Sequence, residues 1–411
     1  MKGDQTLVVL GGGSVWTLHL LAEISALAYD DRLQIRLQGP TEQHLLQNAA
    51  FARSLNRRLD LKTVVNLDEA VSGATIILNQ VRIGGWPTRL DDEILPVQLG
   101  AVGDESLGLG GVRAAFRSLT FVVELARVIR REAPDAWLLN LTNPCDILGQ
   151  AFRWAGVKKV LGLCDHPQML AREMASLAGR PEAYSRFGFI GLNHIGWLQP
   201  PIDMDLRRLL TKRPELELWQ RQWGLLPTDW RMHLAQPARL VRQQQSAPGQ
   251  RALQLIGLNQ KLRQCIHRQD AAEYNSLLRF RNPSWYREIV IPALRGVLGE
   301  EPIRLIAGLP NGRRLSGLDR HAQIETWTGL QFGDAHPEPL PQNTNCLKDI
   351  AEIGHIRALA FQAIRDADLD ALTQYVNNDP LSRPVLDHPD WQKRLGFSDL
   401  ANARFDKMMG I

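Results

Sequence analysis

The sequence predicts an α/β fold, with a Rossmann-like, doubly wound and mainly parallel sheet followed by a mixed α+β domain. Over residues 1–195, short apolar runs typical of buried strands alternate with segments of helical periodicity. The first run, Thr6 to Leu10, leads into Gly11-Gly12-Gly13-Ser14 and then into helical spacing from Thr17 to Leu27. From Trp197 onward the helical segments become longer. We therefore expect a dinucleotide-binding domain at 1–195 and a substrate-binding and oligomerisation domain at 196–411.

The composition is that of an ordinary globular protein. With 411 residues, of which 44% are hydrophobic and 22% charged, the chain can bury a large core. The net charge of +4 is spread along the chain, so it does not indicate nucleic-acid binding, and it suits a small anionic ligand. We see no signal segment and no run that could span a membrane, and the four scattered cysteines indicate free thiols. We expect a cytoplasmic protein.

The glycine turn is the first candidate site. Glycines between a strand and a helix let the backbone approach a pyrophosphate, whose charge the helix N-terminus then meets. Gly11, Gly12, Gly13 and Ser14 are therefore candidate cofactor-binding residues. The third glycine of the usual fingerprint is missing, and a plain tight turn would give the same pattern.

The end of the second strand departs from the usual dinucleotide site. After Leu33, Ile35 and Leu37, where an acidic residue usually meets the ribose hydroxyls, this chain has Gln38-Gly39-Pro40-Thr41-Glu42. Either Glu42, or Gln38 and Thr41, take over that role, or cofactor affinity or selectivity is altered. The sequence leaves these alternatives open.

Arg82 to Gly111 is predicted to be a long polar loop between a buried strand at Thr75–Val81 and an amphipathic helix at Val112–Arg131. Most of its charges are expected to be solvated. Arg89 is the exception, because a guanidinium on such a loop can clamp a phosphate. It is a candidate substrate-binding residue.

Two further strands are expected to end in polar turns. After Trp137–Leu141, Asn143 is expected to cap a helix that Pro144 begins, and its place at a strand end makes it a candidate ligand contact as well. Val157–Leu163 runs into Cys164-Asp165, and Arg186–Ile195 is predicted to be one strand that carries Asn193-His194.

Cys164 and His194 are candidate metal ligands. A thiolate and an imidazole are donors that a borderline-soft metal accepts, although a core thiol and a satisfied histidine are the commoner explanation. The metal interpretation gains weight because Cys164, Asp165, Asn143 and the glycine turn are all expected at one edge of the sheet.

In the second half, Arg281 and Tyr286 stand out. A phenol can act as a base if a neighbouring cation or metal lowers its pKa, although a half-buried tyrosine with a satisfied hydroxyl is the simpler interpretation. Leu305–Leu318 is predicted to be strand, turn and strand, and Ala322–Leu330 a further strand. Cys346–Leu372 is predicted to be a long amphipathic helix or a helix pair.

Taken together, these motifs resemble the family 4 glycoside hydrolases, the NAD-dependent exception among glycosidases. The order and spacing of the motifs carry the resemblance, which covers most of the chain. The matching segments are Gly11 to Ser14, Val81 to Gly111 with Arg89, Thr142-Asn143-Pro144, Gly162 to Asp165, Gly191 to His194, and Arg281 to Tyr286.

The resemblance implies a mechanism with two cofactors. NAD would remove hydride from C3 of the sugar, and a divalent metal, usually manganese, would be held by Cys164 and His194. Tyr286 would abstract the proton from C2, and Asp165 would be the acid that assists departure of the glycosidic oxygen. Arg89, Asn143, Asn193 and Arg281 would bind substrate. Water would then add and hydride return. We expect the chain to form a homodimer or homotetramer.

The resemblance also bears on the substrate. Arg89 with Asp92-Glu93 is similar to members that act on 6-phosphorylated sugars, and Asp165 after the cysteine favours the α-linkage members. Gly39, Asp104 and Asn282-Pro283 depart from the family pattern. The alternatives are a 6-phospho-β-glucosidase, an NAD-dependent dehydrogenase of the 2-hydroxy-acid type, and a sensor that binds without turnover.

Overall fold

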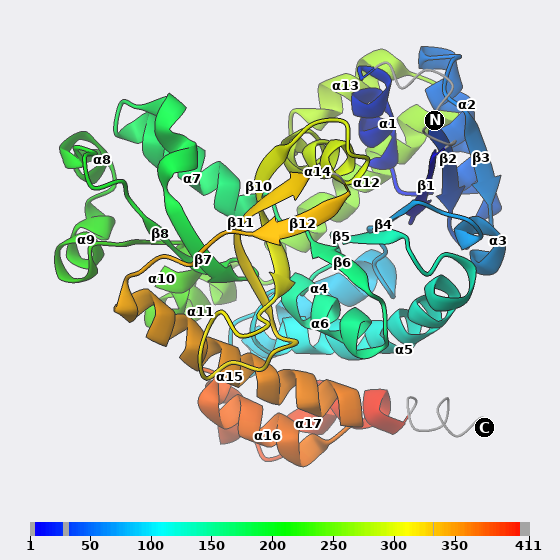
Figure 1. Ribbon diagram of the computed structural model, residues 1–411. Helices are drawn as coiled ribbons and strands as arrows, with labels where there is room; N and C mark the ends of the chain where they lie inside the picture. The colour runs from blue at the N-terminus through cyan, green and yellow to red at the C-terminus, as the bar shows by residue number, and fades with distance from the viewer. Residues whose placement is uncertain (1–4, 28–32, 332, 403–411) are drawn as a thin grey trace.

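The computed structural model describes residues 5–27, 33–331 and 333–402, and these residues build one mixed sheet of twelve strands (Figure 1). Six parallel strands form its first half in the order β3-β2-β1-β4-β5-β6. This is the order of a doubly wound dinucleotide-binding sheet. The strands are β1 Gln5–Leu10, β2 Leu33–Gln38, β3 Leu61–Val64, β4 Ile76–Asn79, β5 Trp137–Asn140 and β6 Lys159–Gly162.

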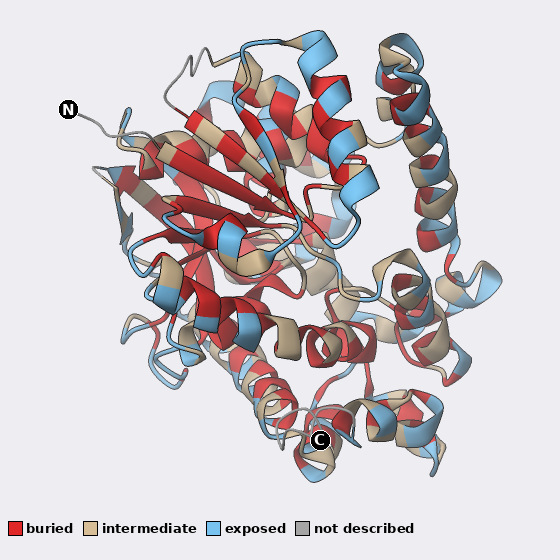
Figure 2. Cartoon of the chain, turned by 90° about the vertical axis from the view of Figure 1, so that its right-hand side faces the viewer, coloured by how far each residue is buried: buried red, intermediate tan, exposed pale blue. Residues whose placement is uncertain are grey.

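Helices cover both faces of the parallel strands. They are α1 Thr17–Ser25, α2 Glu42–Leu55, α3 Leu67–Val71, α4 Gly85–Gln98, α5 Gly108–Glu132 and α6 Cys145–Trp154. Side chains alternate along each strand, so Leu7 and Val9 pack with α1 and α2, while Val8 and Leu10 pack with α3, α5 and α6. Because both faces are covered, the central strands β1, β4, β5 and β6 are mostly apolar, and Figure 2 shows the buried strands at the centre. The outer strands β2 and β3 also carry polar side chains.

The second half of the sheet is antiparallel and continues the first half in the order β10-β11-β7-β8-β9, with β12 paired to β11. The strands are β7 Gly188–Leu192, β8 Ile195–Gln199, β9 Leu226–Pro227, β10 Ile303–Pro310, β11 Gln323–Gln331 and β12 Asp334–Pro337. The two halves join where Gly308 of β10 pairs with Gly162 of β6. The buried side chain of Gln323 lies over this junction, and its Nε2 donates to the carbonyl of Cys145 at 3.1 Å.

The remaining helices pack around both halves of the sheet, and the last helices of the chain, orange to red in Figure 1, form the lower edge of the molecule. They are α7 His166–Leu177, α8 Arg207–Lys212, α9 Glu217–Trp223, α10 Asp229–Ala235, α11 Pro237–Ser246, α12 Gln250–Arg268, α13 Ala271–Leu278, α14 Ile291–Val297, α15 Thr344–Asp366, α16 Leu369–Asn378 and α17 Trp391–Arg394. A single π-helical turn, Tyr286–Val290, precedes α14. The helix pair predicted at 346–372 corresponds to α15 and the start of α16.

Four local predictions are wrong. The segment 82–111 is not one long loop, since α4 occupies Gly85–Gln98 and α5 begins at Gly108. Gly84, Gly85, Pro87 and Pro96, which suggested a loop, lie at the start of α4 or within it. Residues 186–195 form no single parallel strand, because β7 and β8 make an antiparallel hairpin around Asn193 and His194.

The other two concern turns. Asn143 does not cap α6, which begins at Cys145 with Pro144 at the cap position. The strand-turn-strand expected at 305–318 is one strand, β10, followed by a loop that leads to β11.

The predicted α/β class and the mainly parallel first sheet are confirmed. The division at residue 195 stays a prediction, because the sheet runs without a break through both halves. None of the helices in the described ranges is long and apolar enough to cross a membrane.

Candidate active site

A cavity of about 1210 Å³ opens at the carboxyl ends of β1, β4, β5 and β6. It is the place where a doubly wound sheet binds ligands. The cavity collects almost every candidate residue from distant parts of the chain. Its lining includes Gly11, Gly13, Ser14, Arg89, Asn143, Cys164, Asp165, His194, Arg281 and Tyr286.

The glycine turn is shaped by close backbone packing. Gly11 has a φ of +80°, and a Cβ on Gly12 would lie 2.8 Å from the Cα and Cβ of Leu37. Only glycine fits at position 12, since such an approach is closer than any side chain tolerates. Asn48 fixes the turn from α2, because its Nδ2 donates to the carbonyls of Gly12 and Ser14 at 2.8 Å. The backbone can therefore lie close to a bound pyrophosphate, as the sequence predicts.

Tyr286 is fully buried and is linked to the glycine turn through Gln80. Its hydroxyl donates to Oε1 of Gln80 at 2.6 Å, and Nε2 of Gln80 donates to Oγ1 of Thr17 at 3.0 Å. Burial raises the pKa of Tyr286, and the positive charge of Arg281 acts in the opposite direction. Gln80, which follows β4, is thus a site residue that the sequence reasoning missed. Its signal was its position at the end of a buried strand.

Cys164 and His194 reach the cavity from different elements. Cys164 follows β6, whereas His194 lies in the turn between β7 and β8 with a φ of +69°. Nδ1 of His194 is buried without a hydrogen-bond partner among the described residues. Burial lowers the pKa of His194 to about 4, so that its ring is neutral near pH 7. A neutral imidazole with an unpartnered nitrogen is a suitable metal donor.

Asp165, Asn143 and Asn193 lie beside this pair. Burial raises the pKa of Asp165, against the opposing influence of Arg281. Nδ2 of Asn193 donates to Oδ1 of Asn143 at 3.2 Å. Asn193 itself is fully buried and does not line the cavity, so the structure places it behind Asn143.

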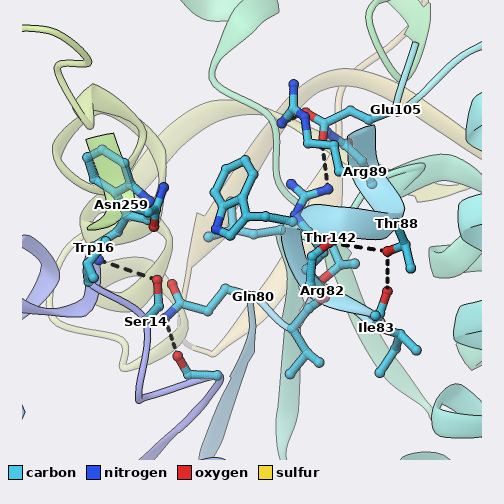
Figure 3. A pocket seen from close by; sticks show the side chains of 18 of the residues that line it. Ser14, Trp16, Gln80, Arg82, Ile83, Thr88, Arg89, Glu105, Thr142 and Asn259 are labelled. Carbon is cyan, nitrogen blue, oxygen red and sulfur yellow. Dashed lines mark hydrogen bonds and ion pairs between the residues drawn. The ribbon is translucent and has the colours of Figure 1, made fainter. Parts of the chain in front are cut away.

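A cluster of charged residues forms the opposite wall (Figure 3). Glu105 contacts Nη1 of Arg82 at 2.7 Å and Nη1 of Arg89 at 2.8 Å. Arg89 also donates from Nε to Glu93 at 2.8 Å. Burial acts to raise the pKa of Glu105, but Arg82, Arg89 and Arg281 outweigh it and hold the pKa at about 2.

The sequence predicts that most charged side chains of residues 82–111 are solvated, and this prediction is wrong. Asp92 and Glu93 are buried, and Asp92 pairs with Arg113 and Arg117. A helix, α4, presents these side chains to the interior, and a carboxylate partner for each buried arginine avoids an isolated buried charge. The repeated acidic and basic residues at helical spacing were the available signal.

The residues present fit the two cofactors that the sequence implies. The closely packed glycine turn fits a dinucleotide, and Cys164 with the unpartnered Nδ1 of His194 fits a divalent metal. Among the described residues, no group of three or more His, Cys, Asp or Glu could hold a metal by itself. A metal at this pair would need further oxygen donors from a ligand.

The comparisons with known proteins agree with this geometry. A family model described as "Family 4 glycosyl hydrolase" matches residues 6–179, which include the glycine turn, Arg89, Asn143, Cys164 and Asp165. The resemblance to family 4 is confirmed. His194, Arg281 and Tyr286 lie beyond the residues that the family 4 model matches.

A maltose-6'-phosphate glucosidase of Bacillus subtilis is 29% identical over 236 residues. The match covers 55% of this chain and 51% of the relative, so the chain spans about half the length of the curated relatives it matches. Two solved structures share the fold of this chain over nearly its whole length.

The 6-phospho-beta glucosidase of Thermotoga maritima, solved with NAD and glucose-6-phosphate, has a TM-score of 0.82 at 20% identity and covers 97% of this chain and 99% of its own. A 6-phospho-alpha-glucosidase from gut microorganisms, solved with NAD and Mn²⁺, has a TM-score of 0.77 at 18% identity and covers 96% and 97%. At this identity the two structures show only that the chain shares their fold.

Proposed function

We propose that this protein is a glycosidase that hydrolyses O-glycosidic bonds of 6-phosphorylated glucosides and depends on NAD and a divalent metal, with manganese the first choice. One observation carries the proposal. A single cavity joins a dinucleotide-type glycine turn to a thiol and imidazole pair, a buried phenol and an arginine cluster. Relatives named as maltose-6'-phosphate glucosidase, 6-phospho-alpha-glucosidase and 6-phospho-beta-glucosidase support it, as do structures that contain NAD, Mn²⁺ and glucose-6-phosphate.

Each cofactor would have its own residues. Gly11, Gly12, Gly13 and Ser14 would hold NAD, and Cys164 with His194 would hold the metal. When bound, NAD supplies a reversible hydride acceptor for the sugar, and the metal supplies a Lewis acid beside the sugar oxygens.

The proton transfers fall to two side chains of this chain. Tyr286 would take the proton from C2 of the sugar, with Gln80 holding its hydroxyl in place and Arg281 stabilising the phenolate. Asp165 would give a proton to the leaving glycosidic oxygen from the neighbouring wall of the cavity. The same cavity wall excludes bulk water from the phenol, which is 1% exposed.

The arginine cluster would bind the 6-phosphate. Arg82, Arg89 and Arg281 surround the single carboxylate of Glu105, so the group as a whole favours an anion. Asn143, braced by Asn193, would hydrogen-bond to the sugar. Asp165 after Cys164 favours the α-linkage, which makes a 6-phospho-α-glucosidase our first choice and a 6-phospho-β-glucosidase the alternative.

The cellular setting is part of the same proposal. All four cysteines are free thiols, which suits a reducing compartment such as the cytoplasm. The substrate is a small phosphorylated sugar, and the assembly is a homodimer or homotetramer. Size-exclusion chromatography with light scattering gives the assembly directly, and a monomer at micromolar concentration would contradict it.

The test of the reaction uses the purified, reduced protein with nitrophenyl α- and β-glucosides, each with and without a 6-phosphate. We expect nitrophenol release that needs both NAD and Mn²⁺ and that is fastest with the 6-phosphorylated α-substrate, without net accumulation of NADH. Net NADH would indicate a dehydrogenase instead. Silence towards every substrate, with nucleotide still bound, would indicate a sensor.

A further inference from the structure

Among the described residues that line the adenosine end of the proposed NAD site, none is acidic where β2 ends. Gly39, Pro40 and Thr41 line the cavity there. Of the residues that could replace the usual carboxylate, Gln38 turns away and donates from Nε2 to the carbonyl of Val65 at 3.0 Å. Glu42 is exposed and is not among the lining residues. Thr41, with a neutral hydroxyl, is the one that remains.

The space that a side chain at position 39 would occupy is open and is not filled by another part of the chain. A Cβ at this position would meet Cδ2 of Leu45 at 3.5 Å and the backbone nitrogen of Gly13 at 3.7 Å, which are ordinary van der Waals distances. The glycine is therefore not required by packing. Its effect is to leave room beside the glycine turn, where the ribose 2′-position of a bound dinucleotide lies in this fold.

The cationic side chain of Arg263 lies beside this room, whereas burial and Arg263 lower the pKa of the neighbouring His44. The guanidinium of Arg263, from α12, lies at the turn and donates to the carbonyl of Gly13 and, at 3.2 Å, to Oδ1 of Asn48. These bonds use two of the five N–H donors of a guanidinium. Arg263 makes no ion pair with a carboxylate among the described residues, unlike Arg89 on the opposite wall. His44, from α2, lies beside Gly13 and Arg263.

A smaller pocket of about 340 Å³ adjoins the cavity and shares His44 and Arg263 with it. Its lining carries further basic residues and, within the part of the chain that the structure describes, no Asp or Glu. The lining residues are Gln43, His44, Gln47, Arg263, Gln264, His267 and Arg268. Arg268 is paired with Glu273, so Arg263 is the cation best placed for an added anion.

We infer that this site accepts the 2′-phosphate of NADP and binds NADP at least as tightly as NAD. In dinucleotide-binding folds, a carboxylate after the second strand bonds to the 2′-hydroxyl and repels a 2′-phosphate, whereas an arginine nearby accommodates the phosphate. This chain lacks the carboxylate, has space in its place, and has Arg263 and His44 beside that space. The inference rests on the proposed use of a nicotinamide dinucleotide and concerns which one is preferred.

Calorimetric titration of the metal-free protein tests it without any turnover. We expect the Kd of NADP to be equal to or lower than that of NAD, and adenosine 2′,5′-bisphosphate to bind about tenfold more tightly than 5′-AMP, from which it differs only in the 2′-phosphate. Gly39→Asp should weaken NADP about tenfold or more and leave NAD unchanged or tighter. Gly39→Asn is the matched control, because it has the same size without the charge, and it should affect the two nucleotides equally.

The outcomes separate this inference from the proposed function. NAD bound ten times more tightly than NADP, or equal effects of Gly39→Asp and Gly39→Asn, would overturn the inference and leave the glycosidase proposal intact. If neither dinucleotide binds, both fail. Tight NADP binding with no glycosidase activity would support the inference and count against the proposed reaction.

Discussion

The two walls of the cavity hold their side chains in opposite ways. On the nucleotide wall, neutral groups form a chain of hydrogen bonds, from Tyr286 to Gln80 and from Gln80 to Thr17. On the arginine wall, charged groups are paired, with Glu105 between Arg82 and Arg89 (Figure 3). On the nucleotide wall each side chain is held by a neutral hydrogen-bond partner. On the arginine wall the arginines are held by the carboxylate of Glu105, whose place an incoming anion can take.

The difference shows how one cavity can keep fixed hydrogen-bond partners in one part and allow ion-pair partners to change in another. A buried neutral hydroxyl that loses its partner costs about 1–3 kcal/mol, so the nucleotide wall keeps one arrangement. An arginine pair can change partners without leaving a charge unpaired, because a phosphate offers the same oxygens as a carboxylate. We therefore expect mutations on the nucleotide wall to affect catalysis, and mutations on the arginine wall to affect substrate binding.

The largest effect is expected from Tyr286→Phe. Loss of a general base slows a reaction roughly 10²- to 10⁴-fold, and here it should lower kcat and stop exchange of the C2 hydrogen with D₂O, as followed by NMR. Tyr274→Phe is the matched control, since the Tyr274 hydroxyl donates to the carbonyl of Val15 at 2.8 Å near the same turn. It should cost about 1 kcal/mol of stability and leave exchange intact. Exchange that survives in Tyr286→Phe excludes the phenol as the base.

Arg89→Met should act mainly on binding. We expect kcat/KM for 6-phosphorylated substrates to fall about 10- to 100-fold, chiefly through KM, with a much smaller change for unphosphorylated glucosides. Arg113→Met removes a comparable buried ion pair, 3.1 Å from Asp92, but Arg113 does not line the cavity. If both variants lose stability equally and only Arg89→Met discriminates between the substrates, the two walls are distinct. Equal kinetic losses would contradict this.

Glu105→Gln should have a smaller and opposite effect. Replacing the Glu105 carboxylate with a neutral amide leaves Arg82 and Arg89 without their shared anionic partner. Because the phosphate then no longer competes with that carboxylate, glucose-6-phosphate should bind about 3- to 10-fold more tightly. Calorimetry with glucose-6-phosphate measures it, and glucose, which lacks the phosphate, is the control ligand. Weaker binding of glucose-6-phosphate would show that Glu105 contacts the substrate favourably.

The smallest effect concerns pH. Because the folded pKa of Glu105, about 2, is lower than its ordinary value of about 4.5, its ion pairs stabilise the protein above pH 4.5, and this stability is lost as pH falls towards 2. The difference in urea midpoint between wild type and Glu105→Gln should therefore be largest near pH 7 and shrink below about pH 4.5. A difference that stays constant down to about pH 3 would argue against the ion pairs as its source.

The parallel half of the sheet was predictable because its local and tertiary signals agree. Apolar runs such as Thr6–Leu10 must be strands when helical segments flank them, and the predicted carboxyl-edge cluster of Asn143, Cys164 and Asp165 follows from that order. His194 was predicted to lie on one strand at Arg186–Ile195, and its place beside Cys164 did not follow from the predicted strand order. It arrives on the turn of an antiparallel hairpin, and long-range pairing of β7 with β11 cannot be read from sequence periodicity.

The arginine wall could not be predicted because its glycines and prolines indicate a loop where the structure has a helix. Gly84, Gly85 and Pro87 are typical of a loop, but they stand at the first turn of α4, where a helix tolerates them. Once the helix is missed, Asp92 and Glu93 look solvated, although their burial depends on arginines from α4 and α5. Gln80 and Arg263 were missed because their roles depend on partners about 70 or more residues away.

The amide of Gln323 sets how the molecule can move. Cβ atoms on Gly149, Gly162 or Gly308 would lie 1.9–2.3 Å from this amide, so the three glycines form a socket that only Gln323 fills at the junction of β6 and β10. Hinge motion at that junction would have to remove the Gln323 side chain from between these glycines and break its hydrogen bond to the carbonyl of Cys145. We therefore expect the two halves of the sheet to move together as one unit rather than to hinge apart where β6 pairs with β10.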